Sequence, residues 1–400
     1  MSIVWFLSLL FTAIGLFLSL WIVIPAPNYP LLILGVSAPE VSPWLVIVNA
    51  IALVLVIVQF NSSWLNNTLL ICSLLALCLS SLPLVQITST NRRLAEEVEA
   101  VLGTDYLNKI PEATRQLMRP QPFILADVFR GIKLKPVRIS RGILFANPDG
   151  IELRLNVYRP LEIGKYPTLV ILYGGAWQQG TAENDESFSR YIAAQGYSVI
   201  AIDYRHAPQY KFPVQLEDVR TALKYIEENA TDLEVDSDRL ALMGRSAGGH
   251  LASLIAYQQD TLPIRAVINY YGPSNLTEGY HQPPIPNPIN NRKMLEEFLG
   301  GTPEELPQLY RQASPFYHIK PSLPPSLLVY PSRDHVIQAK FGRRLYQKLK
   351  EKENQAILLT IPWAEHAFDA IFFGVSNQLV LYYTERFLAW ALKGEIRDEG

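Results

Sequence analysis

The motif Gly-Arg-Ser-Ala-Gly at residues 244–248 offers a nucleophile, the hydroxyl of Ser246. A buried-strand run over 239–243 precedes it, and a helical pattern over 248–257 follows it. Gly-x-Ser-x-Gly between a strand and a helix forms a tight turn that presents the serine hydroxyl above a sheet. A purely structural Gly-Ser turn has the same letters, but the position after a buried strand favours the nucleophile.

A serine hydroxyl is a poor nucleophile without a base, and histidine is the side chain that serves best. Of the six histidines, only His366 lies just past the last expected strand, 356–361. His250 comes one helical turn after Ser246, and we expect it to pack behind the site. The other four stand in loops or beside an acid and are expected to be structural or exposed: His206, His281, His318 and His335.

The base needs a buried acid that fixes its tautomer and stabilises the imidazolium. Asp334 comes just past the expected strand 326–330, where such an acid belongs. Asp369 and Glu365 are too close to His366 in the sequence to orient it from behind. We therefore assign the acid to Asp334.

Acyl transfer also requires hydrogen-bond donors for the charge that develops on the carbonyl oxygen. The expected strand 168–173 ends in Gly174 and Gly175, whose N–H groups can turn inward. Together with the N–H of Ala247 they would form a three-donor oxyanion hole. A plain loop explains two glycines equally well, and only their combination with the Ser246 motif favours this interpretation.

The elements that must position these residues alternate between strands and helices. Such alternation predicts a mostly parallel sheet covered by helices on both faces, with ligands at the carboxyl ends of its strands. A hairpin of 139–145 and 151–158, joined by Asn-Pro-Asp-Gly, comes first. The other expected strands are 168–173, 197–202, 239–243, 266–270, 326–330 and 356–361, and the clearest helices are 213–228, 248–257, 339–352 and 378–392.

With these motifs in this order, residues 168–393 resemble the α/β-hydrolase superfamily. The resemblance is greatest to its hormone-sensitive-lipase-like and kynurenine-formamidase-like carboxylesterases. It implies an α/β-hydrolase fold, a triad of Ser246, Asp334 and His366, and an oxyanion hole of Gly174, Gly175 and Ala247. The matching segments are YGGAW at 173–177, DYRHAP at 203–208, GRSAGGH at 244–250, SRDHV at 332–336 and EHAF at 365–368.

The resemblance also implies roles for residues around the site. Asp203, Tyr204 and Arg205 match an element that usually supports the oxyanion loop. The family normally has histidine where this chain has Tyr173. That histidine supports the glycine loop and is not the base, so the change bears on substrate preference more than on activity.

Residues 273–315 could form a small cap over the site. Equally, they could form a surface segment that does not cover it. The Pro-rich stretch 281–289 would line or flank the entrance. Residues 294–299 are a short helical candidate, and Thr302 with Glu305 forms a capping box that we expect to open a helix.

Charge is nearly absent from the first 91 residues, which contain no Lys, Arg or Asp and only one acid, Glu40. Their three apolar runs, about 3–24, 44–60 and 69–87, predict a membrane region of about three transmembrane helices over 1–91. The second run is short, and residues 31–36 could instead form a re-entrant piece. A cleaved signal peptide is an alternative for the first run, which lacks a basic start and is followed by further apolar runs.

We divide the rest of the chain into a juxtamembrane connector, 92–130, and a catalytic region, 131–396. The connector begins with an amphipathic helix over 92–102. The first basic residues of the chain, Arg92 and Arg93, follow the third run, so the positive-inside rule predicts a cytoplasmic catalytic region in a multi-pass membrane protein.

Composition excludes several classes of partner. The net charge of −2 provides no basic face for nucleic acid. The only cysteines, Cys72 and Cys78, lie in one apolar run and can build neither a disulfide framework nor a cysteine-based zinc site. With no nucleotide or metal motif beside the candidate triad, we expect no cofactor and no metal.

The sequence therefore predicts a membrane-anchored serine hydrolase of carboxylic esters, acting on small-molecule or lipid-like substrates through an acyl-enzyme. An amide or N-formyl hydrolase of the same fold is the first alternative, because attack and oxyanion stabilisation are shared. A non-catalytic docking module with a hydrolase fold is the second. The sequence leaves the acyl and alcohol groups and the oligomeric state open.

Overall fold

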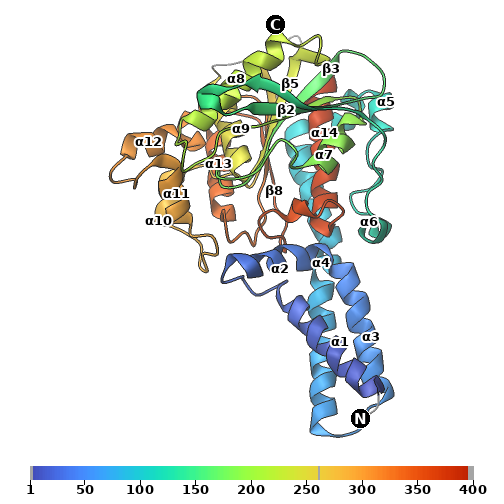
Figure 1. Ribbon diagram of the computed structural model, residues 1–400. Helices are drawn as coiled ribbons and strands as arrows, with labels where there is room; N and C mark the ends of the chain where they lie inside the picture. The colour runs from blue at the N-terminus through green and yellow to red at the C-terminus, as the bar shows by residue number, and fades with distance from the viewer. Residues whose placement is uncertain (1–2, 260–261, 395–400) are drawn as a thin grey trace.

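The computed structural model describes residues 3–259 and 262–394, which form an α/β layer above a narrow bundle of helices (Figure 1). Residues 1–2 and 395–396, the outer ends of the two regions expected from the sequence, lie outside the described residues.

One eight-stranded sheet forms the α/β layer, in the order β1-β2-β4-β3-β5-β6-β7-β8. β2 pairs antiparallel with β1 and with β4, and every other neighbouring pair is parallel. The mostly parallel sheet expected from the sequence is confirmed. The strands are β1 (Arg138–Ala146), β2 (Leu153–Arg159), β3 (Tyr166–Leu172), β4 (Ser198–Ile202), β5 (Val235–Arg245), β6 (Ile264–Tyr270), β7 (Ser326–Val329) and β8 (Ala356–Leu359).

Helices cover both faces of the sheet, as neighbouring residues of β6 demonstrate. Successive strand residues point to opposite faces. Asn269 bonds Ser253 of α9, and Tyr270 bonds Thr384 of α14, so these two helices lie on opposite faces. The main covering helices are α7 (Glu186–Ala193), α8 (Val214–Glu228), α9 (Ala247–Gln258), α13 (Ala339–Glu351) and α14 (Val375–Lys393).

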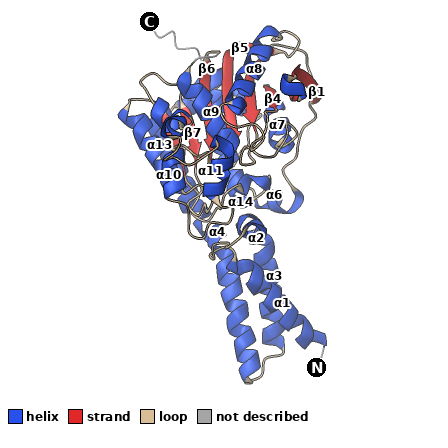
Figure 2. Ribbon diagram, turned by 60° about the vertical axis from the view of Figure 1, so that its left-hand side comes forward, coloured by secondary structure: helices blue, strands red, loops and turns tan. Residues whose placement is uncertain are grey.

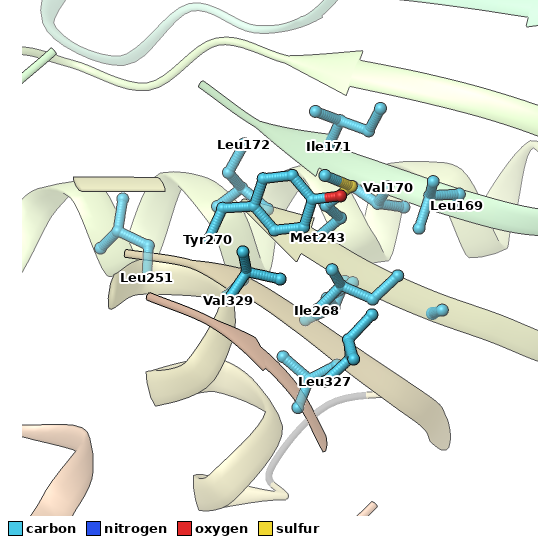
Figure 3. Close-up of a cluster of buried hydrophobic side chains, with 14 of the residues drawn as sticks. Leu169, Val170, Ile171, Leu172, Met243, Leu251, Ile268, Tyr270, Leu327 and Val329 are labelled. Atoms are coloured by element: carbon cyan, nitrogen blue, oxygen red, sulfur yellow. The ribbon is translucent and has the colours of Figure 1, made fainter. Parts of the chain in front are cut away.

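The central strands are buried on both sides, which explains why their sequences are continuous apolar runs rather than alternating ones. Every residue of β3 from Leu169 to Leu172 is at most 1% exposed. Figure 3 shows this strand beside Met243 of β5, Ile268 of β6 and Leu327 of β7, in one continuous core. Burial of this size fixes the strand ends, where the candidate site residues begin.

Three short helices occupy the segment expected as a possible cap: α10 (Leu276–His281), α11 (Asn291–Leu299) and α12 (Pro307–Gln312). Thr302 and Glu305 do exchange the two hydrogen bonds of a capping box. The expectation that this box opens a helix is wrong, because only a turn follows and α12 begins later, at Pro307. Proline is favoured in the first turn of a helix, where its missing N–H costs nothing.

The helical bundle consists of α1 (Ile3–Leu20), α2 (Tyr29–Glu40), α3 (Ser42–Val58) and α4 (Trp64–Leu102). α1 and α4 are long and apolar enough to cross a membrane, and α2 with α3, bent by 84°, would add a third span if the pair is counted as one. The amphipathic helix expected at 92–102 is not separate: the third apolar run continues into it as the single 39-residue helix α4. Short helices link α4 to the sheet: Tyr106–Lys109, α5 (Glu112–Arg115) and α6 (Leu125–Arg130).

α2 differs in direction from the other three helices of the bundle. It lies across the top of the bundle, directly beneath the α/β layer, in both Figure 1 and Figure 2. Leu32 of α2 and Ala26 before it belong to the same buried cluster as the sheet. The bundle and the sheet therefore share one core at this level.

Candidate active site

Ser246 sits at the sharp turn between β5 and α9, with φ of 49° and ψ of −119°. A non-glycine residue at positive φ is uncommon and is held there only by its surroundings. The flanking glycines allow the turn, because a Cβ on Gly244 would lie 2.1 Å from the Gly248 carbonyl oxygen and one on Gly248 would lie 2.0 Å from that of Leu172. This is the geometry the motif predicts.

Ser246, His366 and Asp334 come together in one hydrogen-bonded line. The Nε2 atom of His366 lies 3.0 Å from the Ser246 Oγ, and its Nδ1 lies 2.8 Å from an Asp334 carboxylate oxygen. Asp334 follows β7 and His366 follows β8, so neighbouring parallel strands bring the two side chains to one edge. The arrangement allows His366 to accept the serine proton while Asp334 holds its opposite nitrogen.

Asp334 is fixed from its other side by the backbone. Its second carboxylate oxygen accepts hydrogen bonds from the N–H groups of Val336, at 2.8 Å, and Ile337, at 2.6 Å. Burial raises the pKa of Asp334, whereas His366 and the Ile337 N–H act to lower it. The carboxylate cannot rotate away from His366 without losing these bonds.

Gly174, Gly175 and Ala247 line the same cavity as Ser246. Among the described residues, none accepts a hydrogen bond from these three N–H groups. Gly175 has φ of +135°, and a Cβ there would lie 2.0 Å from the carbonyl oxygen of Gln179. Three unused donors beside a serine hydroxyl suit an oxyanion.

Part of the chain is similar to known proteins. Residues 155–349 match the BD-FAE family. Esterase LipC of Mycobacterium tuberculosis is 30% identical over 249 residues, which cover 58% of this chain and 60% of LipC. The probable carboxylic ester hydrolase LipM of the same organism is 27% identical over 237 residues, covering 54% of this chain and 53% of LipM. The chain thus spans between half and two thirds of the length of these curated relatives.

Solved structures give the fold. An esterase of Pyrobaculum calidifontis aligns with a TM-score of 0.55 at 22% identity, over 70% of this chain and 97% of that one. A fungal esterase structure from Rhizomucor miehei aligns with a TM-score of 0.56 at 21% identity, over 74% and 91%. The chain has the α/β-hydrolase fold. The fold expected from the sequence is confirmed.

Tyr173, where the resembled family has histidine, is buried directly before Gly174 and Gly175. Its hydroxyl lies 2.8 Å from His206 Nε2, and its ring stacks on that of Tyr204 with centroids 4.4 Å apart. The Tyr204 hydroxyl donates in return to the Tyr173 carbonyl at 3.0 Å. Burial raises the pKa of Tyr173, so the phenol stays neutral and able to donate.

Asp203 and Arg205 tie the neighbouring loops together without reaching Ser246. Asp203 accepts a 2.6 Å hydrogen bond from the N–H of Ala182, beyond the glycine loop. The Arg205 guanidinium contacts both carboxylate oxygens of Asp218 and one of Asp149. These bonds fix the loop after β4 against the helix α8 and the β1–β2 turn.

His250, one helical turn after Ser246, is fully buried. Its Nδ1 accepts a hydrogen bond from the Trp177 indole at 3.2 Å, and its Nε2 lies 2.6 Å from the carbonyl of Ala313. Because Nδ1 accepts, Nε2 must carry the proton that bonds Ala313, so the ring is neutral. Burial lowers the pKa of His250 to about 4. It connects Trp177, after β3, to Ala313, directly after α12.

The sequence analysis missed a second acid–histidine pair beside the candidate triad. Glu365 accepts hydrogen bonds from the N–H of His335, at 2.6 Å, and of His366, at 2.9 Å. Its other oxygen lies 2.5 Å from His335 Nδ1. The sequence does place His335 directly after Asp334 and Glu365 directly before His366, and this was the only sign of the pair. The pair joins the loop that holds Asp334 to the loop that holds His366.

Arg245 was also missed, although it stands inside the nucleophile motif. Its buried guanidinium pairs with Asp369 and with Asp185, the latter at 3.2 Å, and Tyr271 donates to Asp369. Burial acts to lower the pKa of Arg245, but these two acids outweigh it and raise the pKa. Asp369 therefore has its own cationic partner, which explains why it does not reach His366.

A cavity of about 960 Å³ surrounds the serine. Its lining includes polar groups such as Gln178 and Asn184. It also includes residues of α2, a helix that the sequence did not connect with the site. The α2 residues that line the cavity are Tyr29, Leu32, Ile33, Val36 and Ser37.

No group of three or more metal-binding side chains occurs among the residues that the structure describes.

Proposed function

We propose that this protein is a membrane-anchored carboxylesterase that forms an acyl-enzyme at Ser246. The observation that carries the proposal is the contact of 3.0 Å between Ser246 Oγ and His366 Nε2, with Asp334 behind the imidazole. Similarity to proteins named as esterases and carboxylic ester hydrolases supports an ester as the substrate.

In the proposed reaction, His366 takes the proton of Ser246 while the oxygen attacks the ester carbonyl. The N–H groups of Gly174, Gly175 and Ala247 stabilise the oxyanion of the tetrahedral intermediate. His366 then gives its proton to the departing alcohol, and Ser246 keeps the acyl group. A water molecule, deprotonated by His366, releases the acid and restores the serine.

The composition of the helical bundle supports the bilayer as the surroundings of α1, α3 and α4. Its buried contacts are made by small and polar residues: the Asn49 amide donates to Ser19, Ser80 and the Ala76 carbonyl, and Thr12 bonds Ser73 at 2.9 Å. Large apolar side chains such as Phe6, Ile51 and Ile71 are on the outside. Helices in membranes typically have small and polar residues at their contacts and large apolar residues facing outward.

The direction of the helices supports a cytoplasmic hydrolase. α1 begins at the end of the bundle away from the sheet, and α4 runs back toward the sheet (Figure 1). Arg92 and Arg93 lie on α4 at the sheet end. Arg130 of α6 belongs to the same end, because Trp44 at the start of α3 donates to the Val128 carbonyl of that helix at 3.2 Å. Basic flanks stay on the cytoplasmic side.

An amide or N-formyl hydrolase would use the same groups, so the choice between ester and amide depends on measurement. The full chain, purified in detergent, should hydrolyse p-nitrophenyl esters and be much slower on the matching p-nitroanilides. The Ser246→Ala variant should lose roughly 10⁴-fold or more in kcat. Equal activity of the variant would contradict the serine mechanism, faster anilide cleavage would favour the amide alternative, and no turnover of either would favour the docking module.

A further inference from the structure

α2 is part of the wall of the active-site cavity, although it belongs to the N-terminal region outside the matched family segment, 155–349. Its residues Leu32, Ile33 and Val36 face the same space as Ser246 and His366. With Ile371 they make this side of the cavity apolar.

The position of α2 is fixed by contacts with the hydrolase. A carboxylate oxygen of the fully buried Glu40 accepts a 2.8 Å hydrogen bond from the N–H of Ser376, in the first turn of α14. Leu32 is 6% exposed within the hydrolase core. α2 also contacts the short helix Phe368–Ala370, which directly follows His366. The wall is therefore a built part of the site.

The mouth of the cavity lies on the same helix. Tyr29 and Ile33 line the cavity and yet are 56% and 55% exposed. α2 lies across the top of the bundle, at the level where α1 ends and α3 begins (Figure 2). If α1, α3 and α4 span a bilayer, these two residues stand at its surface.

We infer that α2 binds the hydrocarbon chain of the substrate, and that the substrate is a membrane-resident ester with a long chain. This inference rests on the proposed function. The chain lies along Leu32, Ile33 and Val36 and leaves past Tyr29 toward the lipid, while the ester carbonyl reaches Ser246. An ester that stays partly in the bilayer avoids exposing its whole chain to water. Each methylene that remains buried makes the free energy of binding more favourable.

The kinetic test compares two variants of α2 in the full chain reconstituted into phosphatidylcholine vesicles. Ile33→Gln changes the cavity wall, and Leu34→Gln changes the next residue, which is half-buried and outside the cavity lining. For Ile33→Gln, the ratio of kcat/KM for p-nitrophenyl decanoate to that for p-nitrophenyl butyrate should fall about 10-fold, the usual effect of a lost apolar contact in a pocket. Leu34→Gln should keep the wild-type ratio.

The chain belongs to either the acyl or the alcohol part of the ester, and a second series separates the two. The second series measures the ratio of kcat/KM for decyl acetate to that for butyl acetate. If Ile33→Gln lowers this ratio but not the ratio in the p-nitrophenyl series, the bound chain belongs to the alcohol. An unchanged ratio in both series would overturn the inference, as would equal effects of Ile33→Gln and Leu34→Gln.

A measurement independent of turnover separates this inference from the proposed function. The Ser246→Ala protein in the same vesicles is irradiated with a decanoate ester that carries a terminal diazirine. Labelling should fall within residues 29–37 and should be displaced by an excess of an unlabelled decanoate ester but not of the matching butyrate ester. Labelling confined to α1 and α3, or unaffected by the unlabelled decanoate ester, would contradict the role of α2 even if the protein proves to be an esterase.

Discussion

At the scale of single residues, Tyr173 stands where the resembled family has histidine, and its hydroxyl contacts His206. The two side chains meet at 2.8 Å under the glycine loop. Tyr173→Ala would remove the ring stacked on Tyr204 and loosen Gly174 and Gly175, and oxyanion donors contribute about 10²–10³ each to the rate. We expect kcat of Tyr173→Ala to fall about 100-fold, measured on p-nitrophenyl butyrate.

Tyr173→Phe is the matched control for this prediction. It keeps the ring and removes only the hydroxyl, so its loss should be within about 10-fold, as for one hydrogen bond of roughly 1 kcal/mol. If Tyr173→Ala retained wild-type rates, the loop-support role would be wrong.

His250 predicts a pH dependence of stability. Its folded pKa of about 4 lies below the unfolded value of about 6.5. The unfolded chain therefore takes up the proton first, and stability decreases as pH falls from 6.5 toward 4. Between pH 7 and pH 5 the loss should amount to about 2 kcal/mol in the free energy of unfolding.

Thermal unfolding at pH 7 and pH 5 measures this effect. The His250→Gln variant keeps a donor and an acceptor at the site but cannot titrate, so its difference between the two pH values should be smaller than that of the wild type. Burial also lowers the pKa of His206, which leaves part of the slope in the variant. An equal pH dependence in both proteins would exclude His250 as a cause.

The positions of Ser246, Asp334 and His366 were predictable because each follows a strand, and parallel strands end at one edge. The pairs Glu365–His335 and Arg245–Asp369 were not. Each depends on the direction of side chains at the ends of strands and just beyond them, and alternation and spacing carry no such information. Asp369 and Glu365 were not expected to orient the His366 ring, because they are too close to it in the sequence. Asp369 pairs with Arg245, and Glu365 bonds the backbone N–H of His366 and the ring of His335.

At the scale of elements, α2 depends on Glu40, the one acid of the first 91 residues. Glu40→Ala would leave the Ser376 N–H without its partner and a void beside Gly374, at a cost of about 1–3 kcal/mol. We expect the unfolding temperature of the detergent-solubilised protein to fall by several degrees. Glu40→Gln keeps a hydrogen-bond acceptor and should lose less than half as much. Equal stability of the three proteins would mean that α2 docks without this contact.

The strands were predictable to within a few residues because two-sided burial imposes continuous apolar runs. The α2 helix was expected only as a possible re-entrant piece, since its apolar residues fit a membrane as well as a protein core. Its docking depends on contacts between Glu40 and Ser376, more than 300 positions apart, which local patterns cannot reveal. Likewise, α4 contains both an apolar run and an amphipathic one. The change in composition between them suggested a domain boundary, but the helix continues through it.

At the scale of the whole molecule, the proposed topology is an N-terminus outside and a hydrolase inside. A green fluorescent protein fused to the C-terminus should therefore be fluorescent, and an alkaline phosphatase fusion at the same place should be inactive. Fusions after Ser62, in the loop between α3 and α4, should give the opposite result. Active phosphatase at the C-terminus would reverse the proposed orientation.

Fluorophosphonate labelling shows whether Ser246 is the activated nucleophile proposed for this membrane-anchored hydrolase. Membranes from cells expressing the full chain are treated with the probe, and the labelled peptide is identified by mass spectrometry. We predict one adduct, on Ser246, in the membrane fraction, and none in the Ser246→Ala variant, which should still be present in equal amount. Persistent labelling of the variant, or an unlabelled wild-type protein, would contradict the account.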